Sequence, residues 1–464
     1  MTDRIAVVGG GISGLSAALA LEPLARARGL ELHVFEREPR WGGAIRTFRQ
    51  DTLVIDGGPD CFLARKPQGV ALCRDLGIEG RLMGLRPGTS GAYVLADGKL
   101  RRIPLGWTTG IPRGVRPLLG ARLLPVGARL RALRDLVPGR PVEGDVSLGA
   151  YLRGRLGDGI VDRLVDPILS GVYAGDLDAL SLESCAPELA ARARSGASLI
   201  WGMVRRRPGP PPTGSVFLTV DTGMQGLVEA ALDRLGSARL HAATSVTALA
   251  RTGDGYELTL AGGGRLDVRG VVLALPAPRA ARVLASAAPR WAQALERVDC
   301  VDLAVVGLAY RDGDVGVPLD GTGFVVPRRE RRAITAATWL GAKWPRPSGS
   351  LVPVRAFLGR AGDRGLLDLS DEQLVAKARG ELEPLMGITA EPMVKVVFRH
   401  PQGLPQYTVG HGQRMRALAE ATRAWPAFAL AGSAWDGVGI PDCIRSGQGA
   451  AAIVAADLGL SGGT

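Results

Sequence analysis

The feature that most constrains this chain is a glycine-rich turn near its N-terminus, set between a short apolar run and a helical pattern. Ile5–Val8 is apolar and leads into residues 9–14, which contain a G-x-G-x-x-G match. Ile12–Arg28 then carries apolar residues at helical spacing, and Leu32–Glu36 has the pattern of a second buried strand. A strand, a glycine turn, a helix and a second strand in this order predict a Rossmann-like dinucleotide-binding unit.

Three glycines and one acidic residue suit this turn to a dinucleotide. Gly9 permits the tight turn, Gly11 lets a pyrophosphate approach the backbone, and Gly14 lets the helix and strand pack closely. The helix N-terminus adds free N–H groups and the positive end of a dipole. Glu36 is placed to accept hydrogen bonds from ribose hydroxyls, and it would repel a 2′-phosphate, so NADP is disfavoured.

Composition narrows the class of protein. The 464 residues are enough for two or three domains, and 46% apolar with 22% charged residues is typical of a globular chain. The formal net charge of +12 points to nucleic acid, an anionic membrane or an acidic substrate, unless it reflects the arginine usage of a GC-rich genome. Nucleic acid is disfavoured, because the chain has no recognition motif and its aromatic content is 5%.

Cysteine and histidine usage bears on metals and compartment. The five cysteines form no C-x-x-C pair, and we expect buried free thiols in a reducing compartment. The four histidines form no cluster with metal-ligand spacing, so no metal is expected. The sequence shows neither a signal peptide nor an apolar run long enough to cross a membrane.

Nucleotide-fold patterns recur in the middle and at the end of the chain. Tyr256–Leu260 and Val271–Ala274 read as strands, and Ala427–Ala431 is a strand before a helix from about residue 442 to 458. These patterns predict one domain built from separated segments. Between them lie an arginine- and leucine-rich helical stretch, at about 100–210, and a strand-rich stretch with one polar helix, at about 300–400.

Two segments resemble the flavin-containing amine oxidase superfamily. Glu36 is followed by Arg37 and then by Gly42-Gly43-Ala44-Ile45-Arg46, where Ala44 replaces the first arginine of some members. The glycine pair permits close backbone approach, and Arg46 can face a diphosphate. Near the C-terminus, residues 437–447 lead into the last helix and resemble the superfamily's segment beside the flavin ring. The implied cofactor is FAD.

Three further motifs resemble one branch, the oxygen-dependent protoporphyrinogen oxidase family. They are Ser170–Asp176, Leu404–Tyr407 with His411, and Gly323–Pro327, and they occur in the family's order along nearly the whole chain. The resemblance assigns no catalytic side chain, because the flavin carries the hydride chemistry. For His411 we expect a structural hydrogen bond.

The resemblance also assigns binding residues by matching motif position. The cofactor contacts are Gly9, Gly10, Gly11, Ile12, Ser13, Gly14, Glu36, Arg37, Gly42, Gly43, Ala44, Arg46, Gly58, Pro59, Val246, Val438, Gly439 and Ile440. The substrate contacts are Gly171, whose carbonyl would hold pyrrole N–H groups, and the apolar clamps Val325, Leu340 and Phe357. An ordinary core position is the alternative for each clamp.

The function implied is FAD-dependent oxidation of protoporphyrinogen IX to protoporphyrin IX in heme biosynthesis. Three two-electron steps use oxygen as acceptor and release hydrogen peroxide. Coproporphyrinogen III oxidation to coproporphyrin III is the alternative, and a flavin amine oxidase or a catalytically silent flavoprotein is a more distant one.

One departure bears on that choice of substrate. Several members carry a propionate-binding arginine where this chain has Gly91 and Ala92, so the partner would be Lys99, Arg101 or Arg102, or the propionates lie in solvent. Because coproporphyrinogen has four propionates and protoporphyrinogen two, the missing arginine favours protoporphyrinogen.

The predicted fold class is α/β, with three parts. A discontinuous Rossmann-like FAD-binding domain covers 1–75, 225–290 and 405–464, and a mixed α+β substrate domain covers 76–100 and 291–404. Residues 101–224 form a helical insertion that associates with a membrane, or else a solvated cap over the active site. We therefore expect a cytoplasmic protein, peripheral on the inner face of the membrane, and the sequence leaves a homodimer open.

Overall fold

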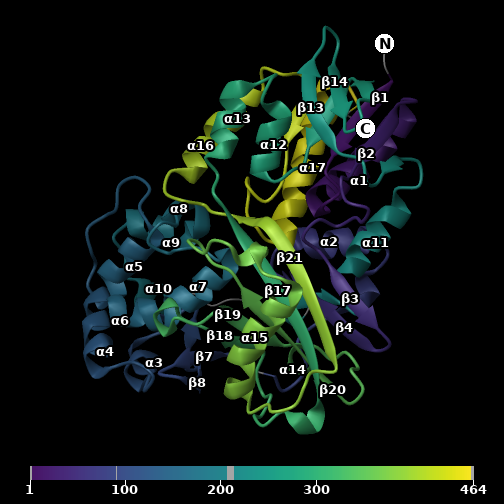
Figure 1. The fold of residues 1–464 in the computed structure, drawn as a ribbon. Coiled ribbons are helices and arrows are strands. Elements are labelled where there is room, and N and C mark those ends of the chain that lie inside the picture. The colour runs from purple at the N-terminus through teal and green to yellow at the C-terminus, as the bar shows by residue number, and fades with distance from the viewer. Residues whose placement is uncertain (1–2, 90, 206–213, 461–464) are drawn as a thin grey trace.

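The computed structural model describes residues 3–89, 91–205 and 214–460 (Figure 1). One of its sheets has five parallel strands in the order β12-β2-β1-β16-β22. The strands are β1 (Arg4–Val8), β2 (Glu31–Phe35), β12 (Arg239–His241), β16 (Gly270–Leu273) and β22 (Phe428–Leu430). Segments far apart in the sequence therefore meet in one sheet. The residue numbers at which domains divide stay a prediction.

One strand predicted for the nucleotide-binding unit lies outside this sheet. β14 (Tyr256–Leu260) pairs antiparallel with β13 (Val246–Arg251) and β15 (Arg265–Val268). The middle of the chain reaches the parallel sheet through β12 and β16 instead. β12 has only three residues, none of them buried, so no apolar run marks it in the sequence.

Both faces of the parallel sheet are covered, which explains why its strands are apolar throughout. Along β1, Ile5 and Val7 face α1 (Ile12–Ala27) and α17 (Ile440–Asp457). Ala6 and Val8 face the opposite cluster, which includes α12 (Ala277–Leu284), α13 (Pro289–Glu296) and the β13–β15 sheet. Helices α1 and α17 pack against each other, and both begin at the carboxyl end of the sheet.

The second large sheet has seven strands in the order β21-β17-β20-β19-β18-β7-β8, antiparallel except between β18 and β7. The predicted strands and the predicted polar helix of this region are present. The strands are β7 (Tyr93–Ala96), β8 (Lys99–Arg102), β17 (Cys300–Arg311), β18 (Gly323–Val325), β19 (Ile334–Trp339), β20 (Leu351–Leu358) and β21 (Val394–Pro405). Helix α15 (Asp371–Met386) covers one face and begins with a capping box from Ser370 and Gln373.

The arginine- and leucine-rich stretch forms a separate helical region around its own apolar cluster, at the left of Figure 1. Its helices are α3 (Val115–Gly120), α4 (Val126–Ala132), α5 (Leu148–Leu156), α6 (Asp158–Ile160), α7 (Asp166–Tyr173), α8 (Leu182–Cys185), α9 (Pro187–Arg194) and α10 (Leu199–Arg205). The loop expected after Arg205 lies at 206–213, outside the described residues. None of the helices in the described ranges is long and apolar enough to cross a membrane.

Smaller elements join these parts. A hairpin of β3 (Thr47–Gln50) and β4 (Leu53–Asp56) and a sheet of β5 (Phe62–Leu63), β11 (Phe217–Val220) and β6 (Leu82–Met83) lie near the two large sheets, and β9 (Trp107–Thr108) and β10 (Ile111–Pro112) form a second hairpin. The remaining helices are α2 (Pro67–Asp75), α11 (Gln225–Arg234), α14 (Leu340–Lys343) and α16 (His411–Thr422).

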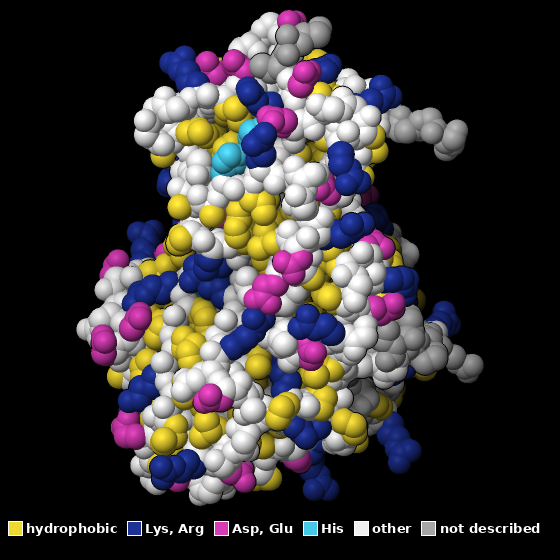
Figure 2. Space-filling view, turned by 90° about the vertical axis from the view of Figure 1, so that its right-hand side faces the viewer, with side chains coloured by type: hydrophobic (Ala, Val, Ile, Leu, Met, Phe, Trp, Pro, Cys, Tyr) yellow, Lys and Arg dark blue, Asp and Glu magenta, His cyan; other side chains and the backbone are white. Residues whose placement is uncertain are grey.

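The structure shows where the charged side chains, the cysteines and the possible metal ligands lie. On the face turned away from the helical region, basic side chains are interspersed with acidic and apolar ones rather than gathered in one patch (Figure 2). All five cysteines are free, as expected, but only Cys73 and Cys443 are buried; Cys61, Cys185 and Cys300 are partly exposed. Among the described residues, no three His, Cys, Asp or Glu side chains are grouped so that they could hold a metal ion.

Candidate active site

The glycine turn of residues 9–14 has the geometry that a pyrophosphate site needs. Gly9 has φ +115°, and a Cβ on Gly14 would lie 1.8 Å from the Gly9 carbonyl oxygen, so helix and turn are in direct contact. A Cβ on Gly11 would instead meet only the Gly43 Cα, at 4.0 Å. Gly11 therefore leaves open space at the N-terminus of α1, where Ile12 and Ser13 open the helix without an acidic residue.

Glu36 lies beside this turn as predicted, immediately after β2. Its side chain is buried, and one carboxylate oxygen accepts a hydrogen bond from the Gly10 N–H at 2.8 Å while the other accepts from Glu38 N–H at 2.9 Å. The Glu36 carbonyl accepts from Thr244 N–H at 2.7 Å, which brings the start of β13, and with it Val246, to the same edge. Arg37 instead pairs with Glu38 at 2.8 Å.

A second glycine turn closes over the first. Gly42 N–H donates to Gly10 O at 2.8 Å, and a Cβ on Gly43 would lie 3.2 Å from the Gly11 Cα. Arg40 supports this turn by donating to Gly43 O at 2.8 Å. The Nε of Arg46 is buried and has no hydrogen-bond partner among the described residues, and burial lowers the pKa of this guanidinium. An unpaired, half-buried cation beside two glycine turns fits the diphosphate of a dinucleotide.

The turn at residues 56–60 contains interactions that the sequence did not reveal. A Cβ on Gly58 would lie 1.9 Å from Ala44 O, so Gly58, next to Pro59, rests on the second glycine turn. Arg355 of β20 donates to Asp56 O at 2.8 Å and to Gly58 O at 2.7 Å, and it pairs with Asp60 at 2.7 Å. Its only signal in the sequence is a charged residue inside the apolar run Leu351–Leu358.

The N-terminus of α17 is the third element of the site. Gly439 caps this helix between Val438 and Ile440, and Asp442 in its first turn pairs with Lys66 at 2.5 Å. Two of the three family motifs, Ser170–Asp176 and Leu404–Tyr407 with His411, meet beside the segment that leads to this helix, whereas Gly323–Pro327 lies at β18. The Tyr407 hydroxyl donates to Ser433 O, the His411 imidazole donates to Ala434 O at 2.8 Å, and the Gln406 amide donates to Tyr173 O at 2.7 Å. The structural role expected for His411 matches this geometry.

Two of the predicted clamps share one face of the seven-stranded sheet. Val325 pairs with Ala336, and Ala336 pairs with Phe357, so the three side chains form a row on that face. The row continues through Val305 to Phe398. A Cβ on Gly57 would lie 2.1 Å from the Phe398 ring, so the row ends against the turn that holds Gly58.

Gly171 lies on α7, which contacts β18 and β19 and therefore sits beside the same row. It is exposed, and no atom lies within 4 Å of where its Cβ would be. Its backbone is thus accessible to a ligand, as the prediction requires.

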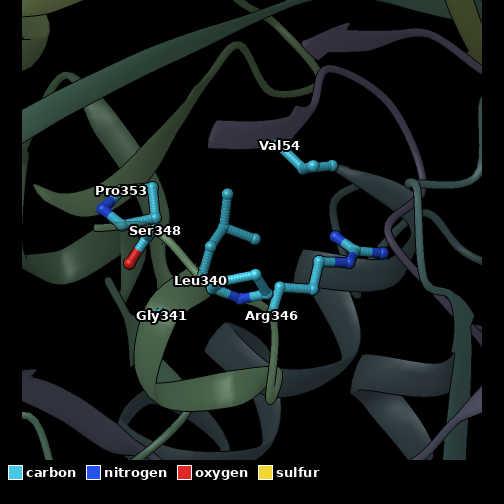
Figure 3. Close-up of a pocket in the computed structure, with 7 residues that line it drawn as sticks. Val54, Leu340, Gly341, Arg346, Ser348 and Pro353 are labelled. Atoms are coloured by element: carbon cyan, nitrogen blue, oxygen red, sulfur yellow. The ribbon is translucent and has the colours of Figure 1, made fainter. Parts of the chain in front are cut away.

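Leu340 is placed differently. It is 3% exposed at the start of α14, in a cluster with Trp344, Ile55 and Phe398. Its side chain points toward Val54 and the Arg346 side chain around a cavity of about 10 Å³, room for a single water molecule (Figure 3). Leu340 therefore packs in the apolar cluster that also contains Val305, Phe357 and Phe398 of the row, and a contact with a ligand stays a prediction.

Comparison with known proteins identifies the family. Residues 12–455 match the family described as flavin containing amine oxidoreductase. The chain belongs to this family. The resemblance stated from the motifs is therefore confirmed, and so is the flavin cofactor; the two glycine turns, Glu36 and the unpaired Arg46 fit the dinucleotide form, FAD.

Three relatives bear on the function of this family member. It is 38% identical over 459 residues to a coproporphyrinogen III oxidase of Bacillus subtilis, covering 96% of this chain and 97% of the relative. A bovine protoporphyrinogen oxidase is 28% identical, covering 98% of each chain. A solved structure from Exiguobacterium sp. 255-15, described as a candidate protoporphyrinogen oxidase, superposes with a TM-score of 0.87 at 35% identity, covering 98% of this chain and 99% of that one.

Proposed function

We propose that this protein oxidises coproporphyrinogen III to coproporphyrin III in heme biosynthesis, with FAD as cofactor and oxygen as acceptor. Full-length similarity to a coproporphyrinogen III oxidase at 38% identity is the observation that carries the proposal. Protoporphyrinogen IX, the substrate predicted first from the sequence, has weaker support, because the bovine enzyme of that name is 28% identical. Coproporphyrinogen III, which the sequence analysis gave as the alternative substrate, is therefore the substrate proposed.

When bound, the flavin supplies the redox chemistry: it takes hydride from the macrocycle and returns electrons to oxygen. The chain's own residues bind and orient. Glu36 and the N-terminus of α1 hold the ribose and pyrophosphate, and Arg46 neutralises the diphosphate. Val325 and Phe357 offer an apolar surface to a large, mostly apolar macrocycle, and the Gly171 carbonyl accepts from pyrrole N–H groups.

A groove at the edge of the sheet supports the more acidic substrate. Arg101 pairs with Val94, and Val94 pairs with Val325, so Arg101 belongs to the face that carries the clamps. Arg101, Arg102 and Arg122 line a groove of about 440 Å³ together with Leu100, Pro104, Gly120 and Leu123. Arg102 is paired with Asp320 at 2.8 Å, so the guanidinium groups of Arg101 and Arg122 are the ones that suit the carboxylates of a tetrapropionate. They would replace the arginine that is missing at Gly91 and Ala92.

The helical region is proposed to rest on a membrane surface. Leu105 is 85% exposed, Val126 61% and Leu130 56%, although all three are apolar. They lie among the arginines of the insertion, including Arg129 and Arg131. Apolar side chains surrounded by bases are the pattern of a peripheral contact with an anionic leaflet. A homodimer stays a prediction.

Anaerobic mixing tests the reaction. The holoenzyme is mixed with coproporphyrinogen III, protoporphyrinogen IX or an amine, and flavin absorbance and porphyrin fluorescence are followed. We expect flavin bleaching and porphyrin fluorescence with both porphyrinogens, with the higher kcat/KM for coproporphyrinogen III, and peroxide release when oxygen is admitted. Bleaching by the amine alone would replace the proposal with an amine oxidase. A flavin that no substrate bleaches would leave a silent flavoprotein.

A further inference from the structure

A buried charge cluster lies under the turn of residues 56–60. Arg355 is 2% exposed and Asp60 is 5% exposed, and their side chains pair at 2.7 Å. Lys343 of α14 pairs with the other oxygen of Asp60 at 2.8 Å, and the Trp344 indole N–H donates to that oxygen at 3.2 Å. Two cations and one anion leave one net positive charge in this cluster. Buried charges of this kind are costly unless they are paired and hydrogen-bonded. In this cluster two cations share a single anion, Asp60.

The neighbouring titratable groups do not cancel that charge. Burial lowers the pKa of His400, which favours the neutral ring, and burial raises the pKa of the Cys61 thiol to about 12. Asp56 is paired with Arg346 at 3.0 Å, so these two residues add no net charge. Attraction to Asp60 raises the pKa of Lys343 in spite of its burial, which keeps the ammonium charged.

Three consecutive carbonyls of the turn are held by side chains of the seven-stranded sheet. Arg355 holds the oxygens of Asp56 and Gly58, and the oxygen of Gly57 accepts from His400 Nε2–H at 2.7 Å. Because a trans peptide is planar, the Gly58 N–H points to the side opposite the Gly57 oxygen. Arg355 and His400 therefore set the direction in which the turn presents its backbone donor.

The turn connects this cluster to the cofactor site. Gly58 rests on Ala44, and the turn that contains Ala44 closes over Gly11 at the N-terminus of α1. On the other side, the Arg355 guanidinium lies over the ring of Phe357, 4.9 Å from its centroid, two residues along the same strand. Arg355 thus touches both the predicted cofactor turn and a predicted substrate clamp.

We propose that Arg355, with Lys343 and Asp60, is a positioning and electrostatic device for the flavin: it would orient the Gly57–Pro59 turn that contacts the cofactor, and it holds one net positive charge behind that turn. A positive charge near the ring stabilises the reduced, more negative flavin and so raises its reduction potential. The inference rests on the cofactor contact proposed for Gly58 and Pro59, and it does not depend on which substrate is oxidised.

Charge variants with opposite signs test the electrostatic part. The midpoint potential of the bound flavin is measured by reductive titration of the holoenzyme, without porphyrinogen. Arg355→Met and Lys343→Met each remove a cation, and we expect each to lower the two-electron potential by about 30 mV, a tenfold change in the equilibrium constant. Asp60→Asn removes the anion and, at a pH low enough for Lys343 to stay protonated without Asp60, should raise the potential by a similar amount.

Two further variants separate charge from geometry. Arg355→Lys keeps the charge but not the planar fork, so it should leave the potential near that of the wild type while the flavin dissociates more readily on dilution. Arg399→Met is the matched control, because Arg399 of β21 also holds two backbone carbonyls and pairs with an aspartate, but this aspartate is Asp371, the first residue of α15. It should leave both readouts unchanged.

The directions of the potential shifts test the electrostatic role, and flavin retention tests the positioning role. If Arg355→Met and Asp60→Asn shift the potential in the same direction, or neither shifts it, the electrostatic role is wrong; if Arg355→Lys retains flavin like the control, the positioning role is wrong. Lys343→Met and Asp60→Asn keep the test valid if the Arg355 variants do not fold. Shifts of the expected signs in an enzyme that oxidises no porphyrinogen would overturn only the proposed function.

Discussion

Gly447 of α17 lies directly against Ser13 of α1: a Cβ on Gly447 would fall 2.0 Å from the Ser13 carbonyl oxygen. The helices α1 and α17, whose N-termini are predicted to hold the pyrophosphate and to lie beside the flavin ring, are therefore in backbone contact. Any side chain at Gly447 must push them apart.

Gly447→Ala should destabilise the protein by about 1–3 kcal/mol, because a methyl group has no room between the helices. It should also weaken flavin retention, since both N-termini move. Gly449→Ala is the matched control, because this position of the same helix faces open space and gains up to about 1 kcal/mol of helix propensity. Thermal unfolding and flavin release measure both effects. Equal Tm values for the two variants would contradict the prediction.

Glu36→Ala should weaken FAD binding by about 1.5–3 kcal/mol, the usual contribution of a hydrogen bond to a charged group. The loss combines the ribose contact with the hydrogen bond from the Gly10 N–H, which orients the glycine turn. Flavin release measured by fluorescence gives the change. Glu38→Ala removes a neighbouring carboxylate whose side chain pairs with Arg37, and it should retain flavin like the wild type.

Arg101→Gln combined with Arg122→Gln should raise KM for coproporphyrinogen III more than for protoporphyrinogen IX. A substrate with four carboxylates is expected to lose more ion pairs to these arginines than a substrate with two. Exposed ion pairs contribute up to about 1 kcal/mol each, so a rise of roughly two- to fivefold per lost pair is expected. Steady-state kinetics at low and high salt measure the rise in KM for each substrate. Salt screens the ion pairs, so the difference between the wild type and the double variant should be smaller at high salt. Lys99→Gln, on the same strand but outside the groove, is the control. Equal changes for both substrates would remove the groove from the proposal.

Leu105→Gln combined with Leu130→Gln should reduce binding to vesicles that contain anionic lipid, because these exposed side chains are the proposed apolar contacts. Flotation with vesicles at low salt measures the bound fraction. Met393→Gln is the control, because Met393 is 55% exposed but lies outside the helical region. A wild-type protein that ignores such vesicles would make the helical region a solvated cap.

Acid should destabilise the fold through its histidines. Burial lowers the pKa of all four of them, His33, His241, His400 and His411. Each is neutral in the folded state and takes a proton on unfolding, so the unfolded state binds more protons once the pH falls below about 6.5. The free energy of unfolding should therefore change little between about pH 7 and pH 8 and fall below about pH 6.5, by at most about 1.4 kcal/mol per pH unit for each histidine.

Urea unfolding at pH 7.5 and pH 5.5 measures this pH dependence. His400→Gln should reduce the difference between the two values, since it removes one group that gains a proton. Stability that rises on acidification over this range would contradict the assignment of neutral buried histidines.

The sequence by itself determined the parts whose physics is local. The glycine turn at residues 9–14, Glu36 and the capped helix α15 follow from short-range patterns that allow few other conformations. Length and periodicity also marked β17 and β20 and the final helix α17. The family motifs added the flavin, which the residues alone could not distinguish from a nicotinamide cofactor.

Tertiary structure decided which of these parts meet. β12 joins the parallel sheet through three residues that carry no apolar signal, and β14, which has one, lies in a different sheet. Leu340 packs in the apolar cluster beside Phe357, and it is not a member of the strand-to-strand row that Val325 and Phe357 share. Arg355 reads in the sequence as an interruption of an apolar strand, and only the folded chain shows it holding two carbonyls almost 300 residues away. Periodicity indicates which side of a helix or strand is buried. A long-range hydrogen bond or ion pair depends on which surfaces pack together, and no short stretch of the sequence carries that information.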